Sequence, residues 1–174
     1  TLGDEHIETH SALNDLALLV FNADKFDQAI PLLTELLDSR VDKQSESRKT
    51  SLSNALARAH QEVGNYEEAL PLYQVALAGY RTRVDDEDSP SAIARTLDRL
   101  ATCSIELEQF EQAEKLLRES VSLRSKLDSD NWRLFRTRSL LGESLSKQEQ
   151  FEAAESELLA AWEGLESRAD QLDS

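Results

Sequence analysis

The chain of 174 residues has little glycine, proline and cysteine, and it has no methionine. Its five glycines are not clustered, so they form no phosphate-binding loop and no nucleophile elbow, and no kinase motif is present. The single cysteine, Cys103, cannot form an internal disulfide. No run of 18 apolar residues occurs, so no segment is expected to span a membrane. Enzyme chemistry has almost no place in such a chain, and we predict that the protein is not an enzyme.

The absence of methionine extends to position 1, which indicates a fragment or a processed chain. The first residues, Thr1 to Asp4, contain neither a basic nor a long apolar region, so they do not form a visible signal peptide. We therefore expect a cytoplasmic location for this segment.

Positive charge is also scarce, because 19 Lys and Arg stand against 34 Asp and Glu and give a net charge of −15. Nucleic acids and anionic membranes are bound mainly through clustered Lys and Arg, so neither is an expected partner. The acidic residues are spread along the chain, as in a solvated exterior.

A motif with fixed internal spacing occurs four times. Its aromatic residue stands three positions before an alanine, and the aromatics Phe26, Tyr66, Phe110 and Phe151 are 40, 44 and 41 residues apart. Ten residues before each aromatic is a leucine (Leu16, Leu56, Leu100, Leu141), followed by a small residue (Ala17, Ala57, Ala101, Gly142). Length varies only outside this core, which predicts rigid helix pairs joined by variable connectors in a helical repeat array.

This order of leucine, small residue, aromatic, alanine and bulky apolar residue resembles the tetratricopeptide repeat family, in its longer form of roughly 42 residues as in kinesin light chain. The segments Leu2 to Thr9 and Leu13 to Ala17 are similar to that subclass, with Ile7 where a proline is usual. Asp130 to Arg133 and Ala160 to Leu165 are similar to arrays appended to bacterial serine/threonine kinases.

The resemblance implies an all-α, right-handed solenoid of four tandem helix-turn-helix units in one domain, 1–174. The repeats are expected at about 9–41, 47–84, 90–128 and 131–169, and the eight helices at about 10–22, 26–40, 47–63, 66–83, 90–107, 110–127, 131–147 and 151–169. We expect Thr9 and Ser89 to cap helices, residues 1–8 to form a connector, and each aromatic to fill the gap beside the small residue. A left-handed Glu or Gln in the last two hairpins costs roughly 1 kcal/mol, which packing offsets.

Few residues suggest chemistry. His6 and His10 have the spacing of a helical metal pair, but no third ligand is placed by sequence, so we expect a structural or solvent role, with no metal and no cofactor. His60 and Cys103 take inward positions and are expected to pack. Asp85 to Asp88 lacks the ligand pattern of a calcium loop and is expected to be a hydrated connector.

The resemblance implies that the first helix of each pair lines a concave, peptide-binding groove. Carried over to this chain, the groove residues are Asn14, Leu18, Asn54, Arg58, Arg95, Asp98, Arg99, Thr102, Arg136 and Ser139. Arg95 and Arg99 match the basic pair of a clamp for C-terminal carboxylates, but Leu18 and Ala55 replace asparagines, which makes such a clamp doubtful.

We predict a non-catalytic protein–protein interaction module that binds a peptide or partner segment in this groove. The alternative is a spacer or self-association region of a larger signalling protein such as a serine/threonine kinase. In that case a homodimer would form through Leu158, Leu159, Trp162 and Leu165 on the last helix.

Overall fold

The computed structural model describes residues 2–39, 46–83, 86–127 and 132–172, with side chains described from Thr9 to Arg168. All regular structure within these ranges is α-helical. The helices are α1 (Leu2–Asn22), α2 (Phe26–Asp38), α3 (Glu46–Glu62), α4 (Tyr66–Arg81), α5 (Ser89–Glu106), α6 (Phe110–Leu127), α7 (Trp132–Lys147) and α8 (Phe151–Leu172).

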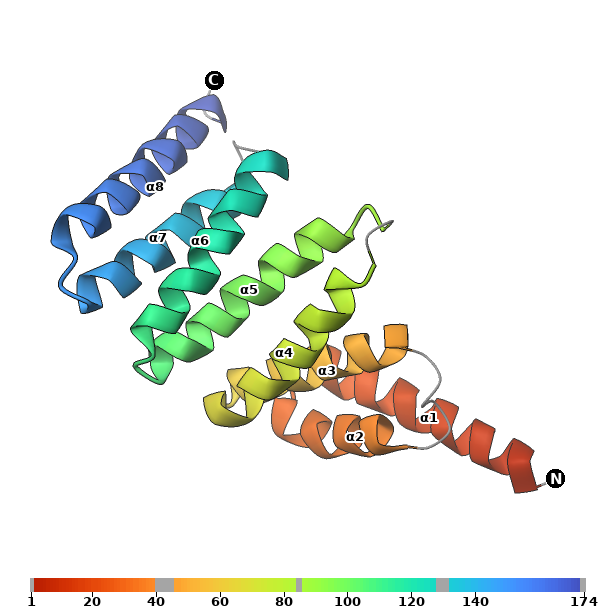
Figure 1. Cartoon of the computed structure of the whole chain (residues 1–174). Helices are drawn as coiled ribbons and strands as arrows, with labels where there is room; N and C mark the ends of the chain where they lie inside the picture. The colour runs from red at the N-terminus through yellow and green to blue at the C-terminus, as the bar shows by residue number, and fades with distance from the viewer. Residues whose placement is uncertain (1, 40–45, 84–85, 128–131, 173–174) are drawn as a thin grey trace. The chain divides into compact units, whose positions relative to one another are not determined.

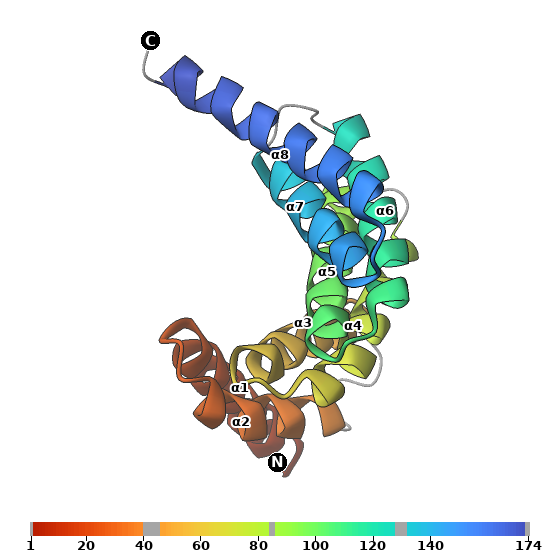
Figure 2. The ribbon, with the colours of Figure 1, turned by 90° about the vertical axis from the view of Figure 1, so that its left-hand side faces the viewer.

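Consecutive helices form four pairs, each joined by a short turn (Figure 1). The chain divides into two compact units, Thr1–Thr82 with α1 to α4 and Arg83–Ser174 with α5 to α8. In the first unit α2 packs against α1 and α3, and α3 packs against α4. In the second unit α6 packs against α5 and α7, and α7 packs against α8 (Figure 2). The predicted all-α solenoid of four helix-turn-helix units is confirmed. The assignment of residues 1–174 to one domain stays a prediction.

The four turns within the pairs share one hydrogen-bond pattern. In each turn one residue has a left-handed backbone, with φ of 56° at Asp24, 83° at Gly64, 57° at Glu108 and 61° at Glu149. The next residue donates its N–H to the carbonyl five positions earlier, over 2.7 to 3.1 Å, in the pairs Lys25–Val20, Asn65–His60, Gln109–Ser104 and Gln150–Leu145. This is the Schellman motif, which satisfies carbonyls that a helix end leaves free. The prediction that glutamate is tolerated in the last two turns is confirmed.

The same residue that closes one helix also opens the next. The carbonyls of Lys25, Asn65, Gln109 and Gln150 each accept the N–H of the motif alanine four residues later, at 2.9 to 3.1 Å. Each of these alanines is buried, at 0 to 3% exposure, in the packing of its helix pair. The turn therefore fixes both helix ends at once, which explains why the leucine-to-aromatic spacing does not vary.

Several predicted helix boundaries differ from the structure. α1 begins at Leu2, so the prediction of a connector over residues 1–8 with Thr9 as the cap is wrong. No proline precedes Pro31, so nothing in that segment excludes helical dihedral angles. Asp88, not Ser89, is the N-cap of α5, and α8 continues to Leu172. The segment 42–45 before the third predicted helix, and residues 128–131 at the start of the seventh, lie outside the described residues.

The prediction that each aromatic fills the gap beside the small residue is wrong in the fourth pair. A Cβ added to Gly142 would lie 2.6 Å from Cγ of Leu158 and 3.2 Å from the carbonyl oxygen of Ala154. The ring of Phe151 is instead 60% exposed. Helical periodicity identifies which residues share a face, but not which residue of the partner helix lies opposite the gap.

Two other glycines also allow helices to approach closely. A Cβ at Gly79 of α4 would lie 1.9 Å from Oγ1 and 2.9 Å from Cβ of Thr50 on α3. A Cβ at Gly164 of α8 would lie 2.1 Å from the buried ring of Phe135 on α7. Glycine at these positions therefore sets the distance between the helices of the second and fourth pairs.

We expect Gly79→Ala to lower the free energy of unfolding. Overpacking a tight helix contact costs about 1–3 kcal/mol, which exceeds the gain of about 1 kcal/mol in helix propensity. Thr50 cannot yield easily, because it is 2% exposed and its own Cβ is among the clashing atoms. Urea unfolding followed by circular dichroism measures the change, with Ala78→Leu at the adjacent exposed position as the control. Equal stability of the two variants would contradict the close contact.

Candidate functional site

Asp98 joins three helices of the second unit. Its carboxylate forms an ion pair with Arg124 of α6, with Oδ2 and Nη2 2.5 Å apart. It also accepts hydrogen bonds from Ser120 Oγ of α6, at 2.5 Å, and from Thr137 Oγ1 of α7, at 3.1 Å. The Arg124 and Asp98 side chains are 9% and 17% exposed, so water screens the pair only weakly. Asp98, which the sequence places among the groove residues, therefore also holds α5, α6 and α7 together.

Two exposed arginines lie close in sequence to members of this network. Arg95 lies one helical turn before Asp98 on α5, and Arg136 directly precedes Thr137 on α7. Both are exposed, and neither has an ion-pair partner among the residues that the structure describes. Their guanidinium groups are thus accessible to solvent on the first helices of two successive pairs, α5 and α7.

The other three predicted groove residues of this unit are half-buried. Thr102 Oγ1 donates to the Asp98 carbonyl at 2.9 Å, and Ser139 Oγ donates to the Phe135 carbonyl at 3.2 Å. These bonds are local to each helix, and a ligand can replace them at small cost. Arg99 is already engaged within the protein.

The predicted groove residues of the first unit are also partly engaged. Nη2 of Arg48 on α3 donates to Oδ1 of Asn14 on α1 at 3.3 Å. The guanidinium carbon of Arg58 lies 5.0 Å from the ring centroid of Phe21 and 5.7 Å from that of Phe26. Arg58 therefore packs over the first hairpin by cation–π contact as well as facing Glu62 at 3.5 Å. Leu18 is 47% exposed and Asn54 is half-buried.

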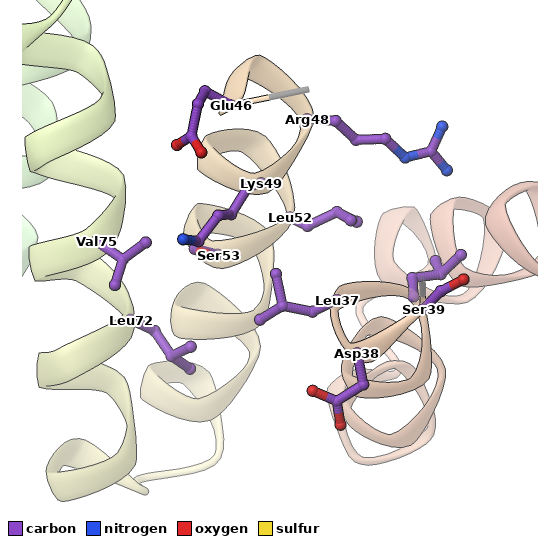
Figure 3. Close-up of a pocket in the computed structure, with 11 residues that line it drawn as sticks. Leu37, Asp38, Ser39, Glu46, Arg48, Lys49, Leu52, Ser53, Leu72 and Val75 are labelled. Carbon is purple, nitrogen blue, oxygen red and sulfur yellow. The ribbon is translucent and has the colours of Figure 1, made fainter. Parts of the chain in front are cut away.

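A crevice of about 440 Å³ opens in the first unit between α2, α3 and α4 (Figure 3). Leu37 points into this space from α2, and Leu72 and Val75 point into it from α4. The remaining lining residues are Leu36, Asp38, Ser39, Glu46, Arg48, Lys49, Leu52 and Ser53. The crevice has apolar walls and a charged rim, and the sequence pattern does not predict it, because its walls come from three helices.

The histidine and carboxylate residues considered as metal ligands do not form a common site in the described part of the chain. Within the described part of the chain, no group of three or more His, Cys, Asp and Glu residues comes together to hold a metal ion. The side chain of His6 lies outside the described residues, and His60 is half-buried with Nδ1 3.5 Å from Nδ2 of Asn65. Asp85 also lies outside them, but residues 86–88 are exposed and form a turn in which the Asp88 N–H donates to Oδ1 of Asp86. Residues 86–88 are therefore an exposed connector, as predicted.

Cys103 is fully buried on α5, as predicted. Burial raises the pKa of its thiol from 9.0 to about 11, and the charge of Arg99 offsets only part of that increase. The group is therefore a neutral thiol at physiological pH, and thiolate chemistry is suppressed.

Sequence reasoning missed Ser120, Arg124 and Thr137. A signal was present, because Ser120 and Arg124 stand ten and fourteen residues after the aromatic, where the last repeat has Ala161 and Leu165. Polar residues in an apolar register indicate a buried polar network. Their common partner, Asp98, could not be inferred, since it lies on another helix.

None of the helices in the described ranges combines the length and the apolar character needed to cross a lipid bilayer.

Paired helices with identical turns, a small-residue notch in each first helix and no strand among the described residues define a helical repeat protein. The family model for the tetratricopeptide repeat matches residues 47–126 and 92–167, which together span more than half of the chain. The chain belongs to the tetratricopeptide repeat family. Comparison with curated proteins gives no match.

Several solved structures share this fold at low sequence identity. MamA from Desulfovibrio magneticus RS-1 is 16% identical with a TM-score of 0.70, over 91% of this chain and 76% of that one. A Rap protein complexed with Competence and Sporulation Factor is 17% identical with a TM-score of 0.67, over 97% and 45%. PlcR of Bacillus thuringiensis, in complex with the peptide PapR7 and DNA, is 16% identical with a TM-score of 0.64, over 90% and 57%.

We expect Asp98→Ala to destabilise the protein by about 3 kcal/mol, because it leaves the Arg124 guanidinium buried without its carboxylate. Removing both charges in Asp98→Ala/Arg124→Met should restore most of this loss. Chemical unfolding of the two single variants and the double variant measures the coupling. Additive losses would show that the pair does not act as a unit.

We expect Cys103 to react with a thiol reagent such as DTNB only on unfolding. At pH 8 the native thiol is both buried and protonated, so the reaction should be slower by at least tenfold than in guanidinium chloride. Because the folded-state pKa is raised, the stabilising contribution is complete below about pH 9 and is lost as pH rises toward 11. The variant Cys103→Ser, which has no thiol, gives the background reaction. Rapid labelling of the native protein would contradict a buried, protonated thiol.

Proposed function

We propose that the protein is a non-catalytic interaction module that binds an acidic peptide, or an acidic segment of a partner, across α5 and α7. The observation that carries this proposal is the exposed pair Arg95 and Arg136, which lies beside the Asp98 network in a chain of net charge −15. Most of the surface of such a chain repels carboxylates, so two exposed guanidinium groups on adjoining helices form a selective attraction.

The proposed site has the geometry for recognising carboxylates. The Thr137 to Asp98 hydrogen bond ties α7 to α5 next to both arginines, so little conformational freedom of the helices is lost on binding. A guanidinium group offers paired N–H donors that match the two oxygens of a carboxylate. The hydroxyls of Thr102 and Ser139 lie on the same helices and add donors or acceptors for a peptide backbone.

The first unit offers a second, more neutral set of groups. The side-chain amides of Asn14 and Asn54 can pair with an extended backbone, and exposed Leu18 can contact an apolar side chain. Arg58 is a weaker candidate for ligand contact, because Phe21 and Phe26 already hold its guanidinium group. We therefore place the charged part of the recognition on the second unit.

The similar structures support a binding role. PlcR is in complex with the peptide PapR7, and the Rap protein is complexed with Competence and Sporulation Factor, so the shared fold accommodates such ligands. The alternative role, a spacer or self-association region, has its own observation in favour, because Leu158, Leu159, Trp162 and Leu165 are exposed on α8. Both roles need no cofactor.

We expect a display library of random 12-residue peptides, selected on the full chain, to become enriched in Asp and Glu. The selected peptides should bind Arg95→Ala/Arg136→Ala at least tenfold more weakly, as measured by fluorescence anisotropy. The matched control is Lys115→Ala/Lys126→Ala, which removes two exposed positive charges from α6 of the same unit. An equal loss in both variants, or no loss in the arginine variant, would overturn the proposed site.

A further inference from the structure

The outer face of α8 carries an exposed apolar stripe. Phe151, Leu158, Trp162 and Leu165 are spaced by seven, four and three residues, which places them on one face of a helix. They are 60%, 43%, 63% and 41% exposed, and neighbouring Leu159 is 51% exposed. These five residues are the α8 stripe. Aromatic side chains of this size dominate the energetics of many interfaces.

The corresponding face of α6 is covered by another helix of the same chain. The residues 41 positions earlier are Phe110, Leu117, Val121 and Arg124, and none of them is exposed. α7 covers this face: Leu117 packs with Leu141 and Leu145, and Ser144 Oγ donates to the Phe110 carbonyl at 2.9 Å. The α8 stripe is therefore the counterpart of a surface that, in this same chain, is covered by a helix of 16 residues.

α8 already uses its other side for α7. Ala154 and Ala161 are buried there, and Oε2 of Glu157 lies 2.7 Å from Nη1 of Arg138. Figure 1 shows α8 at the edge of the second unit with α7 beside it. Leu158 also reaches the notch at Gly142 of α7, so the stripe borders this contact, and its exposed part is the surface that α7 leaves uncovered.

Charge decides which helix fits the stripe. α8 contains six carboxylates and one arginine, and exposed Glu155, Glu163 and Glu166 lie among the stripe residues. A second α8 would bring two such acidic helices together. α1 of a second copy fits no better, because it has four carboxylates and no Lys or Arg. Both pairings place like charges next to a buried contact, which opposes association.

A helix rich in Lys and Arg would instead attract the glutamates of α8. One helix of this chain, α7, already packs against α8 in this way. α7 carries four basic residues and one glutamate, and it packs against acidic α8 on one side while it covers α6 on the other. We propose that the α8 stripe docks an amphipathic helix of a partner protein whose apolar face is bordered by Lys and Arg. Trp162 and Leu165 insert into that apolar face, and the glutamates of α8 pair with the basic border. This surface is separate from the α5–α7 site proposed above.

The test uses two synthetic 18-residue peptides with the same leucine stripe, one with lysine and one with glutamate at all other positions. Trp132→Phe leaves Trp162 as the single tryptophan of the full chain, since the sequence has two. We expect the lysine peptide to shift the Trp162 emission to shorter wavelength and to bind one to one in calorimetry at 150 mM salt. The glutamate peptide should bind at least tenfold more weakly.

Surface variants separate docking from general charge attraction. Trp162→Ala/Leu165→Ala should weaken the lysine peptide at least tenfold, whereas Leu16→Ala/Leu19→Ala, which removes exposed leucines from acidic α1, should change its affinity less than twofold. Circular dichroism checks that both variants stay folded. Equal binding to both variants, or equal binding of the two peptides, would overturn the proposal. A dimer in light scattering that Trp162→Ala abolishes would show that a second copy occupies the stripe instead.

Discussion

The rest of the structure depends on the hydrogen bond that closes each hairpin, from the residue after the left-handed position to the carbonyl five residues earlier. It is a backbone bond, so it forms with glycine, aspartate or glutamate at the left-handed position, provided that packing offsets roughly 1 kcal/mol of strain. Burial of a single leucine such as Leu33 or Leu117 contributes about 1.5–3 kcal/mol, which is enough. The geometry of each hairpin turn is thus set by the backbone. The side chains determine which surfaces each helix pair contacts.

The two units differ in the side chains that join their hairpins. In the first unit the hairpins are joined by apolar contacts around Leu33 and Leu56, with Arg58 lying over two phenylalanine rings. In the second unit a carboxylate, a guanidinium and two hydroxyls replace part of the apolar packing between α5, α6 and α7. A buried polar network tolerates fewer alternative arrangements than leucine does, because each unpaired group would lose its solvation without compensation. The α5–α7 site that we propose therefore lies on the unit whose helix spacing is the more narrowly defined.

The sequence was sufficient for the helices and turns, because those depend on local spacing: the constant interval from leucine to aromatic specified all four hairpins, including the ones without glycine. It was insufficient where the answer lies on another helix. Nothing near Asp98 shows that Arg124 and Thr137 approach it, and Gly142 does not show that Leu158 fills its notch. The groove residues follow from the family resemblance alone, and their ligand contacts stay predictions. The helical extension to Leu2 does not follow from the sequence, because residues 2–9 resemble the family's segment between repeats.

The turn residue that belongs to two helices has a further consequence for how such chains change. A cut within the five residues that separate the accepting carbonyl from the donor of the closing bond would place them on different segments, so both helices would lose an end. A cut in the polar segments between hairpins leaves every closing bond intact. Recombination and laboratory grafting should therefore succeed when whole hairpins are exchanged as cassettes, each bringing its own outward-facing side chains to a new neighbour.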